Sequence, residues 1–324
     1  MDHSPDEALH IIANKVVAQC HTIYVVPGLL YGQSGAVIFL LHYAKHTRIE
    51  KYESFAMELF DSIQNSLMID ADAGANHSVI ELGIVMNYLL GQHFAAGDPD
   101  DLLDEADTFL FDYLDRKNVL YLRKRDLFAI GKYFVLRMIA APASVNHEFH
   151  LKALTRTVEI LQLHFVNVPI CHPEMVKFLY QASKLIPEQS VELLLNQQLN
   201  HYPNQTAWYR STIPNWFNTF FIPEDHELLK EIIIKEITDN CSKYLADNRQ
   251  DTVNEGASGL LIWLNLLHDP KYHDLKKSAV EKIVSDIYMD RTPANPGLFA
   301  GCSGIGLTLL SCIDNRCNEW KNLL

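Results

Sequence analysis

The stretch GLFAGCSGIGLTLL, which spans residues 297–310, is a glycine-rich turn followed by an apolar run. Two other stretches repeat this pattern: GLLYGQSGAVIFLL at residues 28–41 and NEGASGLLIWL at residues 254–264. Each contains a Gly-x-x-Gly pair directly before its apolar residues. One such pair is typical of an ordinary helix start, whereas three copies with matching apolar tails indicate an internal repeat.

The spacing of the copies predicts a chain of helical hairpins. Gly301 lies 45 residues after Gly256, which fits two helices of about 15 residues each and their turns. Gly32 lies 224 residues before Gly256, so the interval has room for further, weaker copies. The candidate starts of those copies are residues 78–83, 126–131, 170–174 and 207–211.

Glycine at these positions has a physical reason. It permits a positive φ in the turn before the helix, and it lets neighbouring backbones approach closely. If several such helices converge, their positively polarised N-termini point at one cavity, which suits an anion or a polarised carbonyl group.

Helical periodicity dominates the rest of the chain, and strand-like alternation is scarce. Apolar side chains recur at helical spacing in two further segments: Leu102, Leu103, Ala106, Phe109, Leu110 and Tyr113, and Leu228, Leu229, Ile232, Ile233 and Ile237. No low-complexity stretch or long linker divides the chain. We therefore predict one all-α domain over residues 1–324.

The composition narrows the classes of partner. The formal net charge is −13, which argues against nucleic acid and anionic membrane surfaces because both require a basic face. The N-terminus has no signal-like segment, and the apolar runs are far shorter than a membrane span. The cysteines contain no Cys-x-x-Cys pair and indicate reduced thiols rather than a disulfide framework. We expect a cytoplasmic protein, and its acidic balance is compatible with a neutral or basic peptide partner.

The three glycine stretches resemble the repeats of the lanthionine synthetase C-like (LanC-like) family. The resemblance covers nearly the whole chain, with eroded middle repeats. It implies an α/α toroid, in which a ring of about seven inner helices is enclosed by about seven outer ones. It also implies a role in the modification of ribosomally synthesised peptides (RiPP biosynthesis).

The resemblance further implies that the family's zinc ligands are missing. The family holds zinc with two Cys and one His, and the metal delivers a peptide thiolate to a dehydroamino acid. A Trp-Cys motif matches Trp208-Tyr209 here, and a Cys-His-Gly motif matches Asn254-Glu255-Gly256. Tyr209, Asn254 and Glu255 would be poor ligands for a metal that prefers sulfur and imidazole. We expect no metal and no cofactor, and Trp208, Tyr209, Asn254 and Glu255 become candidate ligand-binding positions.

Two family catalytic residues have candidate counterparts. His172, in Cys171-His172-Pro173, falls where the family has its catalytic histidine, and Asp126 is the best match for its active-site aspartate. Cys171 and His172 could also be metal ligands, but no second cluster has suitable spacing.

Two acidic patterns admit other interpretations. Residues 100–104 match an Asp-Asp-x-x-Asp magnesium motif. A helix start explains them better, with Asp98 as N-cap, Pro99 at the first position and the leucines on the apolar face. Glu255 and Asp126 could be paired carboxylates of a glycosidase, since some glycosidases are also α/α toroids. The aromatic residues 216–221 would then be a sugar or peptide platform.

We expect a LanC-like pseudoenzyme without zinc that binds a precursor peptide or a partner modification enzyme. The alternatives are an active lanthionine cyclase, which adds Cys thiols to dehydroamino acids, and a glycosidase-like hydrolase.

Overall fold

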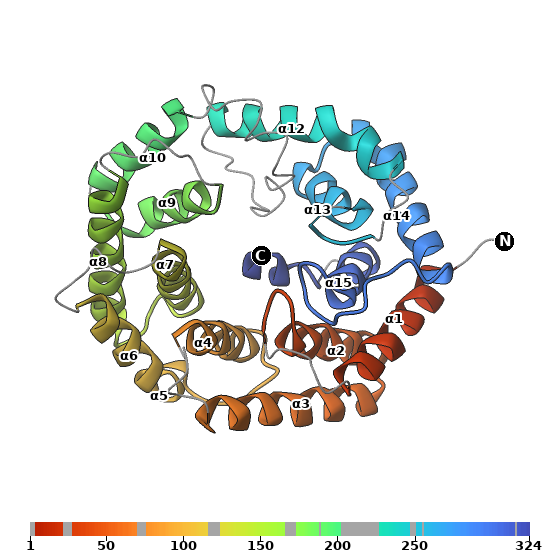
Figure 1. Cartoon of the computed structure of the whole chain (residues 1–324), viewed down its shortest axis with the longest axis horizontal. Helices are drawn as coiled ribbons and strands as arrows, with labels where there is room; N and C mark the ends of the chain where they lie inside the picture. Colours follow the sequence, from red (N-terminus) through yellow and green to blue (C-terminus); the bar gives the residue numbers. More distant parts are fainter. Residues whose placement is uncertain are drawn as a thin grey trace. The chain divides into compact units, whose positions relative to one another are not determined.

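All regular elements of the described residues are helices in the computed structural model, as the sequence predicts (Figure 1). The structure describes residues 4–21, 28–69, 76–115, 124–165, 173–187, 189–201, 227–246, 251–254, 256–314 and 316–324. The chain forms two compact units. Unit 1 combines Met1–Ile69 with Pro214–Leu324, and unit 2 is Asp70–Ile213.

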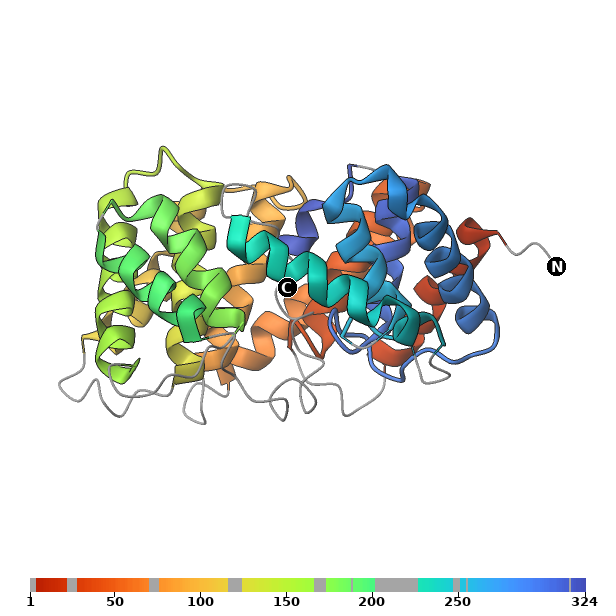
Figure 2. The same ribbon diagram turned by 90° about the horizontal axis from the view of Figure 1, so that it is seen from above.

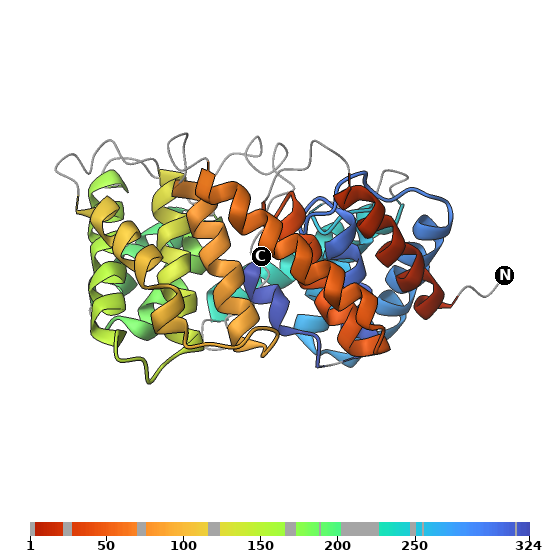
Figure 3. The same cartoon turned by 90° about the horizontal axis from the view of Figure 1, so that it is seen from below.

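Unit 1 is built from both ends of the chain. Its helices are α1 (Pro5–Cys20), α2 (Gln33–Thr47), α3 (Glu50–Ile69), α12 (Glu227–Ala246), α13 (Ala257–Leu267), α14 (His273–Tyr288) and α15 (Cys302–Ile313), with 3-10 helices η4 (Pro270–Tyr272) and η5 (Glu319–Leu323). Figure 3 shows α1 lying against α15. The Lys15 ammonium of α1 also binds the segment between α14 and α15, donating to the Asp290 carboxylate at 2.6 Å and to the Thr292 hydroxyl at 2.8 Å.

Unit 2 is a continuous segment. Its helices are α4 (Asn76–Gly91), α5 (Pro99–Leu102), α6 (Asp104–Leu114), α7 (Lys124–Ala140), α8 (His147–Phe165), α9 (Pro173–Leu185) and α10 (Gln189–His201). Helix α9 packs against α10 and against α8 (Figure 2). Helix α7 packs on α4, α8 and α9 and is the centre of this unit.

The glycine stretches begin the most apolar helices of unit 1. Residues 34–44, 257–264 and 302–311 are all buried, so α2, α13 and α15 have almost no solvent-facing side. By contrast, α14 buries only one face, which includes Ala279, Ile283 and Ile287. A helix that is apolar all round belongs inside a domain, and an amphipathic one covers it. The repeat therefore supplies the inner helices of unit 1.

Glycines inside the helices also follow a repeated pattern. An added Cβ at Gly306 in α15 would lie 2.4 Å from the Phe39 ring of α2. In unit 2, a Cβ at Gly83 would meet Tyr133 of α7 at 2.6 Å, and one at Gly131 would meet Phe178 of α9 at 2.5 Å. Each glycine leaves space for an aromatic ring of a neighbouring helix. This shared packing supports two of the weaker repeats, those at residues 78–83 and 126–131.

The predicted helix start before the acidic string is confirmed. The Asp98 carboxylate accepts from the Asp100 backbone N–H at 2.9 Å, and Pro99 begins α5. The prediction for Leu102 on the apolar face is wrong, because its side chain is 51% exposed. Helix α5 ends there, and α6 begins two residues later with Leu103 buried instead.

Candidate functional site: three glycine-capped loops

The three Gly-x-x-Gly pairs cap α2, α13 and α15 in unit 1. Gly32, Gly256 and Gly301 are the N-cap residues of these helices, as predicted. Their φ values are −148°, −135° and −135°, all in the extended region. The prediction of a positive φ is therefore wrong, because extended backbone is open to any residue. Glycine must be required here for another reason.

That reason is close approach. A Cβ at Gly256 would lie 2.0 Å from the Asp251 Oδ1 atom, and one at Gly301 would lie 2.2 Å from the Asn295 Oδ1 atom. A Cβ at Gly297 would lie 2.5 Å from the Leu30 carbonyl oxygen of another repeat. The second predicted role of these glycines, close packing of neighbouring backbones, is thus confirmed.

Backbone hydrogen bonds join the three cap loops, which we define as residues 28–31, 251–254 and 295–300. The Phe299 N–H donates to the Leu30 carbonyl at 2.8 Å, and the Asn254 N–H donates to the Phe299 carbonyl at 3.1 Å. Loop 295–300 therefore lies between the other two. The cap loops bring together segments from opposite ends of the chain at the N-termini of three inner helices.

Asp251 holds its cap loop onto α13. Its carboxylate accepts from the Ser258 backbone N–H at 3.1 Å and from the Ser258 hydroxyl at 2.5 Å. Burial raises the pKa of the Asp251 carboxyl to about 6, and the nearby Asp286 adds to this, although the bonds from Ser258 oppose it. Asp251 thus takes the role of a helix-capping side chain that glycine at the N-cap cannot perform.

Sequence reasoning missed the serine that all three repeats share. Each pair reads Gly-x-Ser-Gly, and Ser34, Ser258 and Ser303 occupy the second helical position with almost no exposure. Ser258 binds Asp251, whereas the buried Ser303 hydroxyl has no hydrogen-bond partner. The identical residue at an identical place in each copy was the signal that could have revealed this role.

Asn254 is the one described residue among the predicted ligand-binding positions. Its side-chain Oδ1 atom is buried and has no hydrogen-bond partner. A carboxamide is a poor zinc ligand. Cys302 on the neighbouring helix donates its thiol proton to the Pro293 carbonyl, and burial raises the pKa of that thiol, so no thiolate is prepared there. These residues do not fit a zinc site.

The other predicted residues are only partly placed. Asp126 lies in the first turn of α7 in unit 2, is 2% exposed, and accepts a hydrogen bond from the Tyr113 hydroxyl at 3.2 Å. His172, Trp208, Tyr209 and Glu255 lie outside the described residues, as do Cys171 and residues 216–221. Within the described part of the chain, no three His, Cys, Asp or Glu side chains form a group that could hold a metal.

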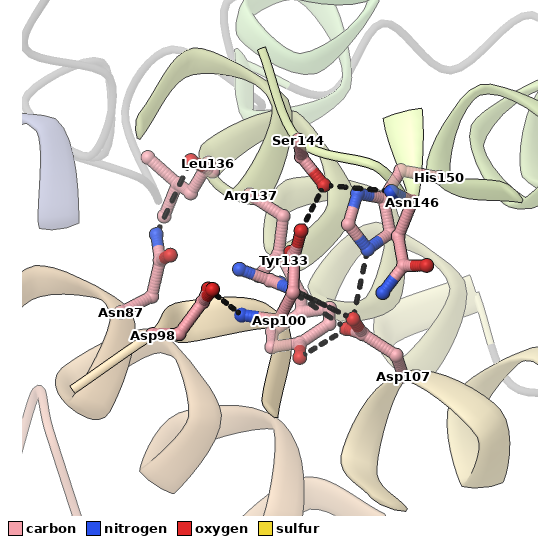
Figure 4. Close-up of polar contacts among 10 residues, drawn as sticks. All are labelled: Asn87, Asp98, Asp100, Asp107, Tyr133, Leu136, Arg137, Ser144, Asn146 and His150. Carbon is pink, nitrogen blue, oxygen red and sulfur yellow. Dashed lines mark hydrogen bonds and ion pairs between the residues drawn. The ribbon is translucent and has the colours of Figure 1, made fainter. Parts of the chain in front are cut away.

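A second polar cluster, which sequence reasoning also missed, lies inside unit 2. The Arg137 guanidinium donates to Asp100 and to Asp107, both at 2.9 Å, and His150 Nε2 lies 2.8 Å from Asp107 (Figure 4). Burial alone would raise the pKa of Asp107, but bonds from His150, Arg137 and Tyr133 hold it below its usual range. Arg137, Tyr133 and His150 are fully buried, so the cluster ties α5, α6, α7 and α8 together and gives no access to a substrate.

None of the described helices is long and apolar enough to span a membrane. Comparison of the chain with family models, curated proteins and solved structures finds no match.

Proposed function

We propose that the chain is a LanC-like protein of the α/α-toroid type that binds a precursor peptide, or the enzyme that modifies it, without zinc-dependent ring formation. The joined cap loops carry this proposal. They unite three Gly-x-x-Gly copies that lie far apart in the sequence, at the N-termini of apolar inner helices. Convergent inner helices are what the resemblance to the family implies.

The donor set supports the absence of zinc chemistry. Asn254 takes a position where the family has a sulfur ligand, and its amide oxygen is a weak substitute. The test is elemental analysis of protein purified without a metal-binding tag. We expect much less than one zinc per chain. One zinc per chain, lost on Cys171→Ala or His172→Ala substitution, would contradict the proposal and identify that pair as ligands.

Peptide binding is tested with a dehydrated, Cys-, Ser- and Thr-rich precursor peptide carrying a fluorophore. We expect saturable binding by fluorescence anisotropy. A control peptide whose sequence is scrambled and enriched in acidic residues should bind more weakly, because the protein carries a net charge of −13. Absence of binding to the precursor at the highest soluble protein concentration would contradict the proposal.

The glycosidase alternative receives less support. It needs two carboxylates that face a cleft, and Asp126 is 2% exposed with the Tyr113 hydroxyl on its carboxylate. A count of the free thiols in a bound peptide distinguishes the cyclase alternative from our proposal, because only a cyclase consumes those thiols.

A further inference from the structure

Two buried carboxylates of unit 1 act on each other, and only one of them has a cation. Asp286 of α14 is 1% exposed and forms an ion pair with the Lys282 ammonium. Asp251 of the cap loop 251–254 is 3% exposed, and its carboxylate accepts from the backbone N–H and the hydroxyl of Ser258. Both donors to Asp251 are neutral, and it forms no ion pair with any residue that the structure describes.

The surroundings of Asp251 oppose its ionised form. Burial raises the pKa of the carboxyl to about 6, although the two bonds from Ser258 act in the opposite direction. Two charged groups of α14 also act on it: the Asp286 carboxylate raises the pKa, and the Lys282 ammonium lowers it by less. Arg291 faces Asp286, with its Nη1 atom 3.8 Å from the Asp286 Oδ1 atom. A negative charge on Asp251 therefore forms away from water and beside another carboxylate, which is unfavourable.

The cap loop 251–254 is a short segment that joins α13 to the other cap loops. The Val253 side chain is buried against α15, where a Cβ at Gly304 would lie 2.7 Å from the Val253 Cγ2 atom. The Asn254 N–H donates to the Phe299 carbonyl at 3.1 Å. Such a loop exposes few buried groups when it opens, so it opens at a lower free-energy cost than the whole protein unfolds.

We propose that the cap loop 251–254 is a pH-sensitive switch that stays closed on α13 while Asp251 is protonated and opens locally when Asp251 ionises. The neutral carboxyl satisfies both polar groups of Ser258, because it accepts from the N–H and donates its own proton to the hydroxyl oxygen. Opening brings the ionised carboxylate into water and breaks the bond from Asn254 to Phe299. The proposal concerns unit 1 alone and does not rest on the proposed function.

The test is hydrogen exchange of the full chain, resolved to single amides and corrected for the intrinsic rate at each pH. In the open loop the Asp251 carboxyl has its ordinary pKa of 3.8, against about 6 in the closed loop, so opening becomes easier as pH rises between these values. The protection of the Ser258 and Asn254 amides should fall about 10-fold from about pH 5 to about pH 8. Low urea should leave their protection unchanged while it lowers that of α15, because a local opening exposes little surface.

Three variants identify the group that titrates. Asp251→Asn imitates the neutral carboxyl, because its amide can accept from the Ser258 N–H and donate to the hydroxyl. It should keep the protection seen at low pH and lose the fall at high pH. Asp286→Asn removes the neighbouring charge and should make the fall smaller. The matched control is Asp269→Asn, which changes an exposed carboxylate that caps η4 and should show the fall of the wild type.

Three results would overturn the switch. The first is equal protection of the Ser258 and Asn254 amides and those of α15, with the same dependence on urea, because the loop would then open only on global unfolding. The second is a wild-type protection that does not change with pH. The third is a fall that persists in Asp251→Asn, which would assign the titration to another group.

Discussion

The cap loops require glycine at individual positions because neighbouring atoms leave no space for a Cβ, not because the backbone conformation excludes other residues. Gly256 and Gly301 adopt extended φ values, yet a methyl group at either would overlap an Asp or Asn oxygen. Asp251 and Asn295 can reach the start of their helices only because that space is empty. A side chain at the N-cap would displace the carboxylate that secures Ser258.

The first prediction concerns this space. Gly256→Ala should destabilise the protein by about 1–3 kcal/mol, as overpacking of a tight site does. The matched control is Gly91→Ala, since a Cβ at Gly91 has nothing within 4 Å. That variant should be neutral or more stable by up to about 1 kcal/mol. Urea unfolding measures both, and equal effects of the two substitutions would refute the steric explanation.

The second prediction concerns Asp251 and pH. Burial raises the pKa of its carboxyl from 3.8 to about 6, so between these values the folded protein keeps a proton that the unfolded chain has lost. The free energy of unfolding must therefore fall as pH rises through this interval. From about pH 4 to pH 7, wild type should lose about 2–3 kcal/mol more stability than Asp251→Asn. Parallel pH profiles of the two proteins would show that burial does not raise the pKa of the Asp251 carboxyl.

Helix packing in unit 2 depends on one buried cation. Arg137 on α7 lies between Asp100 of α5 and Asp107 of α6, and Asp107 also receives His150 of α8. Four helices thus share one ionic cluster, in which the Asp100 and Asp107 carboxylates face the same Arg137 guanidinium. Removing one partner leaves a buried charge unpaired, which costs far more than the net value of the pair.

The third prediction follows from that asymmetry. Arg137→Ala should destabilise the protein by about 3–5 kcal/mol, because Asp107 would remain buried without its cation. Arg156→Ala removes the exposed pair with Glu159 on α8 and should cost less than about 0.5 kcal/mol. Both are measured by chemical unfolding. A loss in Arg137→Ala as small as that in Arg156→Ala would mean that water solvates the cluster.

The same elements show what the sequence could and could not predict. Local patterns located the starts of α2, α13 and α15 and the Asp98 cap, because glycine, capping and apolar periodicity act over a few residues. The pairing of Phe299 with Leu30 could not be predicted, since it joins segments from opposite ends of the chain. Nor could composition reveal that Asn295 is satisfied and Asn254 is not, because that difference depends on which backbone groups each amide meets.

In the molecule as a whole, the first and last segments of the chain meet in unit 1. Lys15 binds the residues between α14 and α15, and the Tyr288 hydroxyl donates to Glu7 at 2.8 Å. The hydrogen bond from the Phe299 N–H to the Leu30 carbonyl places the first Gly-x-x-Gly copy beside the last one, so the joined cap loops need both ends of the chain. The resemblance to the LanC-like family implies a zinc-bound thiolate at the positions of Tyr209, Asn254 and Glu255. None of these three residues supplies a soft ligand.

The decisive measurement is the count of free thiols in a dehydrated, Cys-containing precursor peptide incubated with the protein. Michael addition leaves the mass unchanged, so thiols must be trapped and counted over time. Without zinc, a thiol of pKa about 8.5 is only a few per cent thiolate at neutral pH. We predict that the peptide binds while its thiols disappear at the rate seen without protein. Rapid thiol loss that requires the protein and is abolished by His172→Ala would contradict this and identify a cyclase that works without the metal.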